Sequence, residues 1–251
     1  MITLALVGLG RWGRNIVSTL ETIPNVNLKY LCTHNWLELF EKTDLDAVII
    51  ATPPSTHFSI ANTFLERGLP VFVEKPMVLS IVEAEKLRAT VKQSGQIFMV
   101  GYQYLYNDYI NYLKKEIETG FFEKILGIKS EHFVSPSRPD VNILWDAGPH
   151  PLSIFQYFFA PQKLISATGR FEHDSVSVKV SFANAPELQI IASSFGEIRT
   201  RKLTIIGEKA IAVLDETLEK DKLTIIKNGQ TIKPKINLRP PIRNELEHFI
   251  D

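Results

Sequence analysis

Cysteine is nearly absent from this chain, since Cys32 is the only one among 251 residues. A single cysteine excludes an internal disulfide and any metal site built from several cysteines, and it fits a reducing compartment. The sequence also has no apolar run close to the ~18–20 residues that a membrane-spanning helix needs. Its first residues form a strand pattern rather than a basic segment followed by an apolar one. We therefore expect a cytoplasmic protein without a membrane anchor.

An excess of charge is missing as well. The 28 basic residues cancel the 28 acidic ones, and neither sign gathers into a long block. This balance excludes the electrostatic footprint of a nucleic-acid-binding or membrane-binding protein. No second histidine or cysteine lies near His150 to complete a ligand set, so we expect no metal site. A small neutral or phosphorylated ligand is the partner that remains.

The first hundred residues alternate apolar strand patterns with helical ones, which is typical of a doubly wound parallel sheet in an α/β fold. The expected helices are Ser55–Arg67 and Ser80–Lys92, and the strands are Ile2–Val7, Val26–Leu31, Asp46–Ala51, Val71–Val73 and Ile97–Val100. The link from Cys32 to Leu45 is too short for a full crossover helix, although Trp36–Glu41 has room for a turn or two.

The pattern changes after Tyr102. A helix over Asp108–Glu118 and a strand over Ile125–Phe133 precede a series of strands from Leu164 onward, which predicts a mostly antiparallel sheet in an α+β domain. At the end, Glu245–Asp251 has the pattern of the first turns of an amphipathic helix. We place a dinucleotide-binding domain at 1–101 and a substrate and oligomerisation domain at 102–251.

A glycine-rich segment follows the first strand directly and leads into a helical pattern at 15–20. In a GxGxxG turn of this kind, Gly8 permits the tight turn, Gly10 lets the backbone approach a pyrophosphate, and Gly13 lets the helix pack closely on the strand. The helix N-terminus then supplies N–H groups to the anion. A purely structural turn is the alternative, but the strand before it and the helix after it favour a dinucleotide site.

Two further segments carry residues suited to proton transfer. Lys75 stands before Pro76 at the carboxyl end of a parallel strand, the edge where ligands bind in open α/β sheets. His150 lies between Pro149 and Pro151, at the start of a helix expected over Leu152–Phe159 with Pro151 in its first position. A helix N-terminus favours the neutral imidazole, which can accept a proton. A solvated lysine and a helix-capping histidine are the structural alternatives.

Taken together, these segments resemble the family of glucose–fructose oxidoreductase, inositol dehydrogenase and the MocA-type dehydrogenases. The motifs occur in order over almost the whole chain: GLGRWG at 8–13, ATPPSTH at 51–57, EKP at 74–76 and DAGPH at 146–150. The resemblance implies an oxidoreductase that interconverts a secondary alcohol and a ketone on a sugar, nucleotide sugar or cyclitol, using NAD or NADP. A non-catalytic dinucleotide-binding regulator on the same scaffold is the alternative.

The resemblance also implies roles for single residues. Lys75 would contact the reacting hydroxyl, His150 would be the acid/base, and Asp146 would assist it or bind substrate. The implied substrate contacts are Gln103, Arg138, Asn142 and Trp145. The implied cofactor contacts are Gly8, Gly10, Arg11, Trp12, Gly13, Thr33, Thr52, Pro53, His57 and Glu74.

Three departures from the family pattern concern the cofactor, the substrate and the chain end. Thr33 stands where members often carry an acidic residue that grips the adenosine ribose, and Arg11 is the only nearby candidate for a 2′-phosphate, so the choice between NAD and NADP stays open. The segment 101–106 offers aromatic and amide groups where arginines are frequent, and the C-terminal helix is short for the family. We also expect a homo-oligomer, because the C-terminal strands carry apolar residues on both faces.

Overall fold

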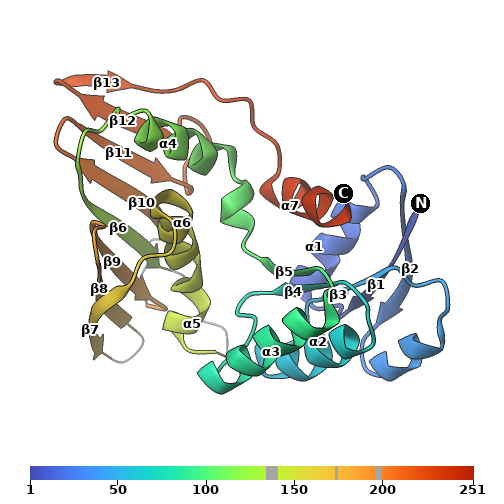
Figure 1. Ribbon diagram of the computed structural model, residues 1–251. Coiled ribbons are helices and arrows are strands. Elements are labelled where there is room, and N and C mark those ends of the chain that lie inside the picture. The colour runs from blue at the N-terminus through green and yellow to red at the C-terminus, as the bar shows by residue number, and fades with distance from the viewer. Residues whose placement is uncertain (134–140, 173–174, 196–198) are drawn as a thin grey trace. The chain divides into compact units, whose positions relative to one another are not determined.

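The computed structural model describes residues 1–133, 141–172, 175–195 and 199–251. The chain divides into two compact units: unit 1 comprises Met1–Gln103 with Pro240–Asp251, and unit 2 comprises Tyr104–Arg239. Unit 1 contains a parallel sheet flanked by helices, and unit 2 contains a larger, mostly antiparallel sheet (Figure 1). The predicted α/β fold class with a following α+β part is confirmed.

Unit 1 is built on five parallel strands in the order β2-β1-β3-β4-β5. These strands are β1 (Ile2–Val7), β2 (Val26–Cys32), β3 (Ala47–Ile50), β4 (Val71–Glu74) and β5 (Phe98–Gly101). The strand order reverses between β1 and β3, so the turn after β1 lies at the switch point where open α/β sheets bind ligands. As predicted, the link from β2 to β3 is short and contains only the 3-10 helix η1 (Trp36–Glu41).

Helices cover both faces of this sheet (Figure 1). α1 (Arg11–Leu20) and α7 (Pro241–Ile250) pack on one face, and α2 (His57–Glu66) and α3 (Ile81–Ser94) pack on the other. Strand β1 shows why the chain alternates here, because Leu4 and Leu6 join the core with α1, whereas Ala5 and Val7 join the core with α2 and α3. Buried parallel strands are apolar on both faces for this reason.

The C-terminal segment differs from the sequence expectation. Residues 240–251, expected in the second domain, belong to unit 1, and helix α7 begins at Pro241 rather than near Glu245. The reason is apolar packing: Leu246 is fully buried beside α1, and the ring of Phe249 lies 5.6 Å from that of Phe72 in an edge-to-face contact. Helix α1 likewise begins four residues before the predicted 15–20, which places Gly13 within its first turn.

Unit 2 is built on eight strands in the order β13-β12-β11-β10-β6-β9-β8-β7. Every neighbouring pair is antiparallel except β6 and β9. The strands are β6 (Ile125–Phe133), β7 (Leu164–Glu172), β8 (Ser175–Phe182), β9 (Glu187–Ser193), β10 (Thr200–Gly207), β11 (Ala210–Asp215), β12 (Leu223–Lys227) and β13 (Gln230–Ile232). Helices α4 (Asp108–Glu118) and α6 (Pro149–Phe159) pack on one face of this sheet, and the hydrophobic core of unit 2 lies between these helices and the sheet.

The helix that carries His150 starts earlier than predicted. Helix α6 begins at Pro149, not at Pro151, and it is preceded by a short helix α5 (Ile143–Ala147) that contains Asp146. Proline is tolerated throughout a first helical turn, because the N–H that it lacks has no partner there. His150 therefore lies inside the first turn of α6.

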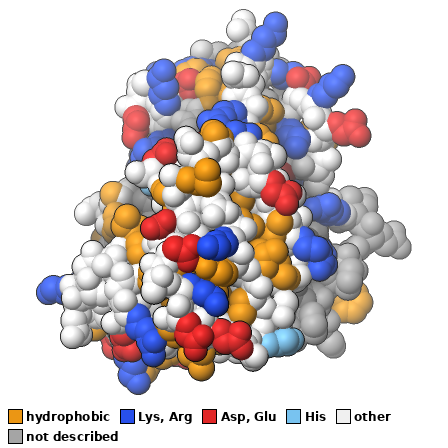
Figure 2. Space-filling view, turned by 90° about the vertical axis from the view of Figure 1, so that its right-hand side faces the viewer, with side chains coloured by type: hydrophobic (Ala, Val, Ile, Leu, Met, Phe, Trp, Pro, Cys, Tyr) orange, Lys and Arg blue, Asp and Glu red, His pale blue; other side chains and the backbone are white. Residues whose placement is uncertain are grey.

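The surface shows no dominance of one charge on the face that Figure 2 presents, where acidic and basic side chains are interspersed with apolar ones. This distribution matches the equal numbers of acidic and basic residues in the sequence. Among the helices of the described ranges, none has the length and apolar character needed to cross a lipid bilayer.

Candidate functional site

The glycine-rich turn after β1 has the geometry that close approach requires. Gly8 has φ +104°, and a Cβ there would lie 2.5 Å from the carbonyl oxygen of Ala51. A Cβ on Gly13 would lie 2.0 Å from the carbonyl oxygen of Gly8, so the first turn of α1 packs directly against the backbone of the loop at Gly8. Both positions need glycine for internal packing.

Gly10 differs, because an added Cβ would meet nothing within 4 Å. Gly10 is also the N-cap of α1, where no side chain makes a capping bond and no acidic residue occupies the first turn. The N–H groups at this helix end therefore receive no capping bond from the Gly10 position, and they carry the positive end of the helix dipole. These residues fit a dinucleotide pyrophosphate, since an anion supplies the acceptors that the protein leaves out.

Trp12 and Glu74, two predicted cofactor contacts, are joined to each other: the indole Nε1 of Trp12 donates a hydrogen bond to Oε1 of Glu74. The same carboxylate oxygen lies 2.9 Å from the position of a Cβ on Gly101. Helix α7 adds Glu245, which is 1% exposed and whose Oε1 has no hydrogen-bond partner in the described structure. Burial and the charge of Glu74 raise the pKa of Glu245 to about 9.

The loop after β3 is held by His57. This side chain is 1% exposed, with Nδ1 2.8 Å from the carbonyl oxygen of Pro76 and Nε2 2.8 Å from that of Thr52. Thr52 also accepts a hydrogen bond from the Thr56 hydroxyl at 2.7 Å. His57 thus links the loop after β3 to the turn after β4, and its side chain holds these segments in place from within the unit.

Lys75 follows β4 directly and is partly buried. Because β1, β3 and β4 are parallel, the glycine turn, the loop at 51–57 and Lys75 all lie at the carboxyl edge of one sheet. Thr33 and Arg11, the residues expected near the adenosine ribose, are both exposed, as is Pro53.

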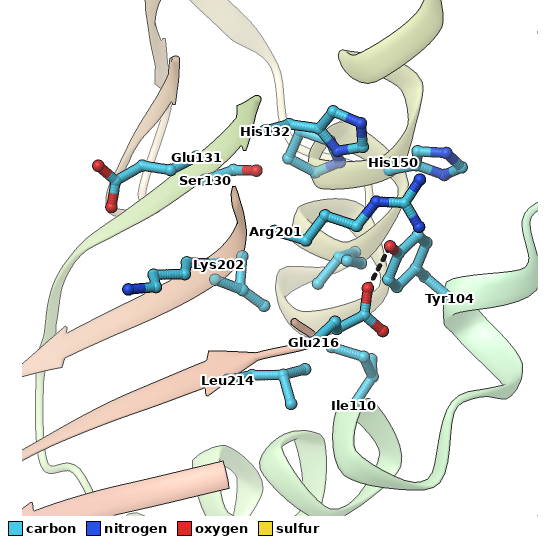
Figure 3. A pocket seen from close by; sticks show the side chains of 13 residues that line it. Tyr104, Ile110, Ser130, Glu131, His132, His150, Arg201, Lys202, Leu214 and Glu216 are labelled. Atoms are coloured by element: carbon cyan, nitrogen blue, oxygen red, sulfur yellow. Dashed lines mark hydrogen bonds between the residues drawn. The ribbon is translucent and has the colours of Figure 1, made fainter. Parts of the chain in front are cut away.

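The second group of polar side chains lies within unit 2, around His150 (Figure 3). A cavity of about 30 Å³ is lined by Tyr104, Ile110, Ser130, Glu131, His132, His150, Pro151, Ile154, Arg201, Lys202, Leu203, Leu214 and Glu216. The ring of His150 lies 4.7 Å from the ring of Tyr104, edge to face, and 6.5 Å from the nearly parallel ring of His132.

A hydrogen-bonded network supports one side of this cavity. Tyr104 donates its hydroxyl to Oε2 of Glu216, and the side-chain nitrogen of Asn107 donates to Oε1 of Glu216 at 3.2 Å. Burial raises the pKa of Glu216, while the hydrogen bond from Tyr104 and the charge of Arg201 lower it. Burial, followed by the charge of Glu216, raises the pKa of Tyr104 well above the usual range. Glu216 therefore has both oxygens occupied.

The structure places the remaining predicted site residues in several positions. Asn142 caps α5 by accepting a hydrogen bond from the backbone N–H of Trp145 at 3.0 Å, and Trp145 is 40% exposed. Gln103 is the last residue of the first part of unit 1, and Arg138 lies outside the described residues. Lys75 belongs to unit 1 and His150 to unit 2, and their convergence on one substrate stays a prediction.

Sequence reasoning missed His132, Arg201, Glu216 and Glu245. The first three come from β6, β10 and the residue after β11, so only the pairing of these strands brings them together. Glu245 had a local signal, because Ile242 and Phe249 stand three residues before it and four after it, which places it on the apolar face of its helix.

Comparisons with known proteins agree with this arrangement. Residues 23–102 match the model of an oxidoreductase family with an NAD-binding Rossmann fold. The chain is 31% identical over 196 residues to scyllo-inositol 2-dehydrogenase (NAD(+)) of Bacillus subtilis (strain 168), an alignment that covers 67% of this chain and 57% of that enzyme. The chain thus spans little more than half of this relative.

Solved structures show the same fold. UDP-N-acetylglucosamine 3-dehydrogenase from Acidithiobacillus ferrooxidans superimposes with a TM-score of 0.85 at 19% identity, covering 99% of this chain and 87% of the other. An inositol dehydrogenase homolog from Azotobacter vinelandii, complexed with NADH and myo-inositol, gives 0.82 at 20% identity, covering 96% and 78%.

The chain belongs to the family of glucose–fructose oxidoreductase, inositol dehydrogenase and the MocA-type oxidoreductases, which confirms the predicted family. Its cofactor class is a nicotinamide dinucleotide, with NAD and NADP both still open.

Proposed function

We propose that this protein oxidises a secondary alcohol of a sugar, nucleotide sugar or cyclitol to a ketone, or reduces the ketone, with NAD or NADP. The observation that carries the proposal is the turn at 8–13, where Gly8 and Gly13 are packed tightly but the space beside Gly10 is open at an uncapped helix end. A merely structural turn has no need of this open, electropositive position. The relative scyllo-inositol 2-dehydrogenase (NAD(+)) is a dehydrogenase by name and supports the same chemistry.

In this proposal unit 1 holds the cofactor and Lys75 holds the reacting hydroxyl. The bound nicotinamide supplies the hydride acceptor or donor. Gly10 and the N-terminus of α1 bind the pyrophosphate, and His57 keeps the neighbouring loops in place. The Lys75 ammonium is a compact donor that can orient an alcohol oxygen. Unit 2 contributes His150, whose imidazole takes the hydroxyl proton on oxidation and returns it on reduction. Asp146 assists His150 or binds the substrate.

Replacement of Lys75 by Ala and of His150 by Asn tests these roles. We expect each variant to lose turnover by roughly 10²–10⁴-fold, the usual range for an acid/base group, while the affinity for NAD or NADP stays near that of the parent. Lys86→Ala and His248→Asn are matched controls, because both side chains are exposed on helices. Full activity in both Lys75→Ala and His150→Asn would refute the assignment.

A regulator that binds a dinucleotide without turnover makes a different prediction. Such a protein would bind NAD or NADP but oxidise nothing in a broad panel of sugars, cyclitols and nucleotide sugars. Neither relatives nor structure supports this alternative, since His150 faces a cavity with His132 and Arg201. The single cysteine supports a cytoplasmic location for either function.

We also propose that the sheet of unit 2 forms a subunit interface through the face opposite α4 and α6. Ile206, Ile211 and Ile226 stand side by side on β10, β11 and β12, and they are 38%, 40% and 48% exposed. A contiguous apolar stripe of this kind is typical of a contact surface. Ile211→Glu should shift the protein toward monomer in light scattering, whereas Lys209→Glu, at an exposed site before the same strand, should not. A parent that is monomeric at micromolar concentration would contradict the proposal.

A further inference from the structure

The ring of Tyr104 packs against the imidazole of His150 and is itself held by a carboxylate. The two rings lie 4.7 Å apart with 64° between their planes, and the Tyr104 hydroxyl donates a hydrogen bond to Glu216 (Figure 3). All three residues belong to unit 2. We propose that Glu216 and Tyr104 are positioning residues for His150: the carboxylate fixes the tyrosine ring, and the ring fixes the imidazole. The inference rests on the proposed function, in which His150 transfers the hydroxyl proton.

His150 needs support of this kind because helix α6 fixes only its backbone. The residue lies in the first turn of the helix, and its carbonyl oxygen accepts a hydrogen bond from the Ser153 hydroxyl at 2.8 Å. The imidazole can still turn about the two bonds of its side chain. Proton transfer requires a ring nitrogen within roughly 2.6–3.2 Å of the substrate hydroxyl. A neighbouring ring in edge-to-face contact restricts the imidazole to fewer orientations.

Glu216 has the rigid backbone that an anchor requires. It follows β11 directly, and its N–H donates to the carbonyl oxygen of Arg201 at 2.9 Å, which ties it to β10. On one side, the carboxylate of Asp215 accepts a hydrogen bond from the N–H of Thr217 at 3.0 Å and closes the turn around Glu216. The backbone of Glu216 is therefore held from the sheet and from the turn.

Asn107 holds the second oxygen of the same carboxylate. This side chain is 8% exposed, and its Oδ1 accepts the N–H of Tyr109 at 2.9 Å as the cap of α4. The cap fixes the orientation of the amide, so its nitrogen donates to Oε1 of Glu216 at 3.2 Å. The N–H of Asn107 also donates to the carbonyl oxygen of Tyr104 at 3.1 Å. One turn thus directs two donors at one carboxylate, which sets the direction of the Tyr104 ring.

The structural alternative is that this network only stabilises unit 2. Tyr157 provides the comparison, because it lies on the same helix as His150, is partly buried, and donates its hydroxyl to Oδ1 of Asn111 at 2.8 Å. Loss of either tyrosine hydroxyl removes one hydrogen bond from unit 2. If the network is merely structural, the two losses have the same consequences. If Tyr104 positions His150, only its loss changes catalysis.

Tyr104→Phe is the central variant, because it keeps the ring and every charge but removes the bond to Glu216. We expect kcat for the best substrate of the sugar and cyclitol panel to fall roughly tenfold, since a misplacement of about 1 Å can cost up to ~10²-fold. KM and the affinity for NAD or NADP should stay near those of the parent. Tyr157→Phe, the matched control, should keep kcat within about twofold of the parent.

Variants of Glu216 test the order of the contacts. Glu216→Leu should lower kcat about as much as Tyr104→Phe, and Glu216→Gln should restore most of it, because an amide can still bond to the hydroxyl. The double variant Tyr104→Phe/Glu216→Leu should be no slower than the slower single variant, since both changes act through one contact.

Nuclear magnetic resonance of the histidine ring protons tests the positioning without any turnover. The His150 signals are assigned by their loss in His150→Asn. The ring current of Tyr104 displaces them at 4.7 Å between centroids, so Tyr104→Phe and Glu216→Leu should both shift them. Tyr157→Phe should leave them in place. Circular dichroism shows whether each variant is folded, and Tyr104→Phe decides the matter if Glu216→Leu is not.

Unchanged His150 signals in folded Tyr104→Phe would overturn the inference, as would parent-like kcat in this variant, an equal loss of kcat in Tyr157→Phe, or additive losses in the double variant. Full activity in Tyr104→Phe but not in His150→Asn refutes the positioning role alone. Full activity in His150→Asn refutes the proposed function itself. In a protein without turnover, the His150 signals still decide whether Tyr104 and Glu216 orient the ring.

Discussion

Glu245 makes the stability of the protein depend on pH in an unusual direction. Its pKa is about 9 in the folded protein, because the side chain is buried and lies near Glu74, against an ordinary value of 4.5. Between these two values the folded state keeps a proton that the unfolded state releases. The contribution of Glu245 to the free energy of unfolding therefore falls as pH rises from about 4.5 to about 9, and it is constant outside this window.

The size of the effect follows from the two pKa values. Each pH unit within the window changes the free energy of unfolding by about 1.4 kcal/mol. At pH 7 the solution is about 2.5 units above the ordinary pKa, so the unfolded state gains by releasing a proton that the folded state keeps. The free energy of unfolding is therefore about 3 kcal/mol lower at pH 7 than at pH 4. Glu245→Gln has nearly the same shape but does not titrate. Any cost of burying the amide is independent of pH, so only the slope reports the proton.

Urea unfolding followed by tryptophan fluorescence, with Trp12 as a probe in unit 1, measures this slope between pH 5 and 8.5. The stability of Glu245→Gln relative to the parent should rise by about 1.4 kcal/mol per pH unit over this range. Glu247→Gln is the matched control, because Glu247 lies on the same helix but pairs with Arg243 at 2.8 Å and is partly exposed. It should run parallel to the parent. Parallel curves for Glu245→Gln and the parent would refute the assigned burial of the proton.

Three further predictions concern unit 1. Gly10→Val should weaken NAD and NADP binding without lowering the unfolding midpoint. Gly13→Ala should lower the unfolding midpoint, because its Cβ would clash with the carbonyl oxygen of Gly8. Unchanged affinity in folded Gly10→Val would contradict the placement of the pyrophosphate beside Gly10. The affinities for NAD and NADP, measured by thermal shift, should differ by less than roughly a hundredfold, which is about 2.7 kcal/mol. The reason is that Thr33 offers neither a carboxylate for a free ribose nor a positive charge for a 2′-phosphate. Ser80→Ala removes the side-chain acceptor for the N–H of Glu83 and should lower unfolding free energy by about 1 kcal/mol in urea titration.

Features set by neighbouring residues could be predicted from the sequence. The strand Ile2–Val7, the helix Asp108–Glu118 and the strand Ile125–Phe133 have the predicted bounds, because apolar periodicity and local turn residues define them. The start of α6 could not be placed, since both Pro149 and Pro151 are compatible with a first turn. The short strand β13 (Gln230–Ile232) was missed because all three of its residues are exposed and give no apolar pattern.

The site was predictable only in part for the same reason. The glycines of the turn and the flanking prolines of His150 are local signals, and the structure gives each a definite geometry. Arg201 gave no signal in the sequence, because it comes to lie beside His132 only through the pairing of β10 with β6. The two residues are almost seventy positions apart in the chain. Local sequence patterns do not predict which distant strands will pair.

The return of helix α7 to unit 1 has a consequence for biosynthesis. During translation the sheet of unit 1 emerges before unit 2, but the helix that covers Phe72 and the apolar side of α1 is made only after unit 2. All of unit 2 leaves the ribosome in between, so the nascent chain exposes this apolar surface until helix α7 has also left the ribosome. Transiently exposed apolar surface promotes aggregation and chaperone binding. The emergence of helix α7 from the ribosome is therefore the event that completes unit 1.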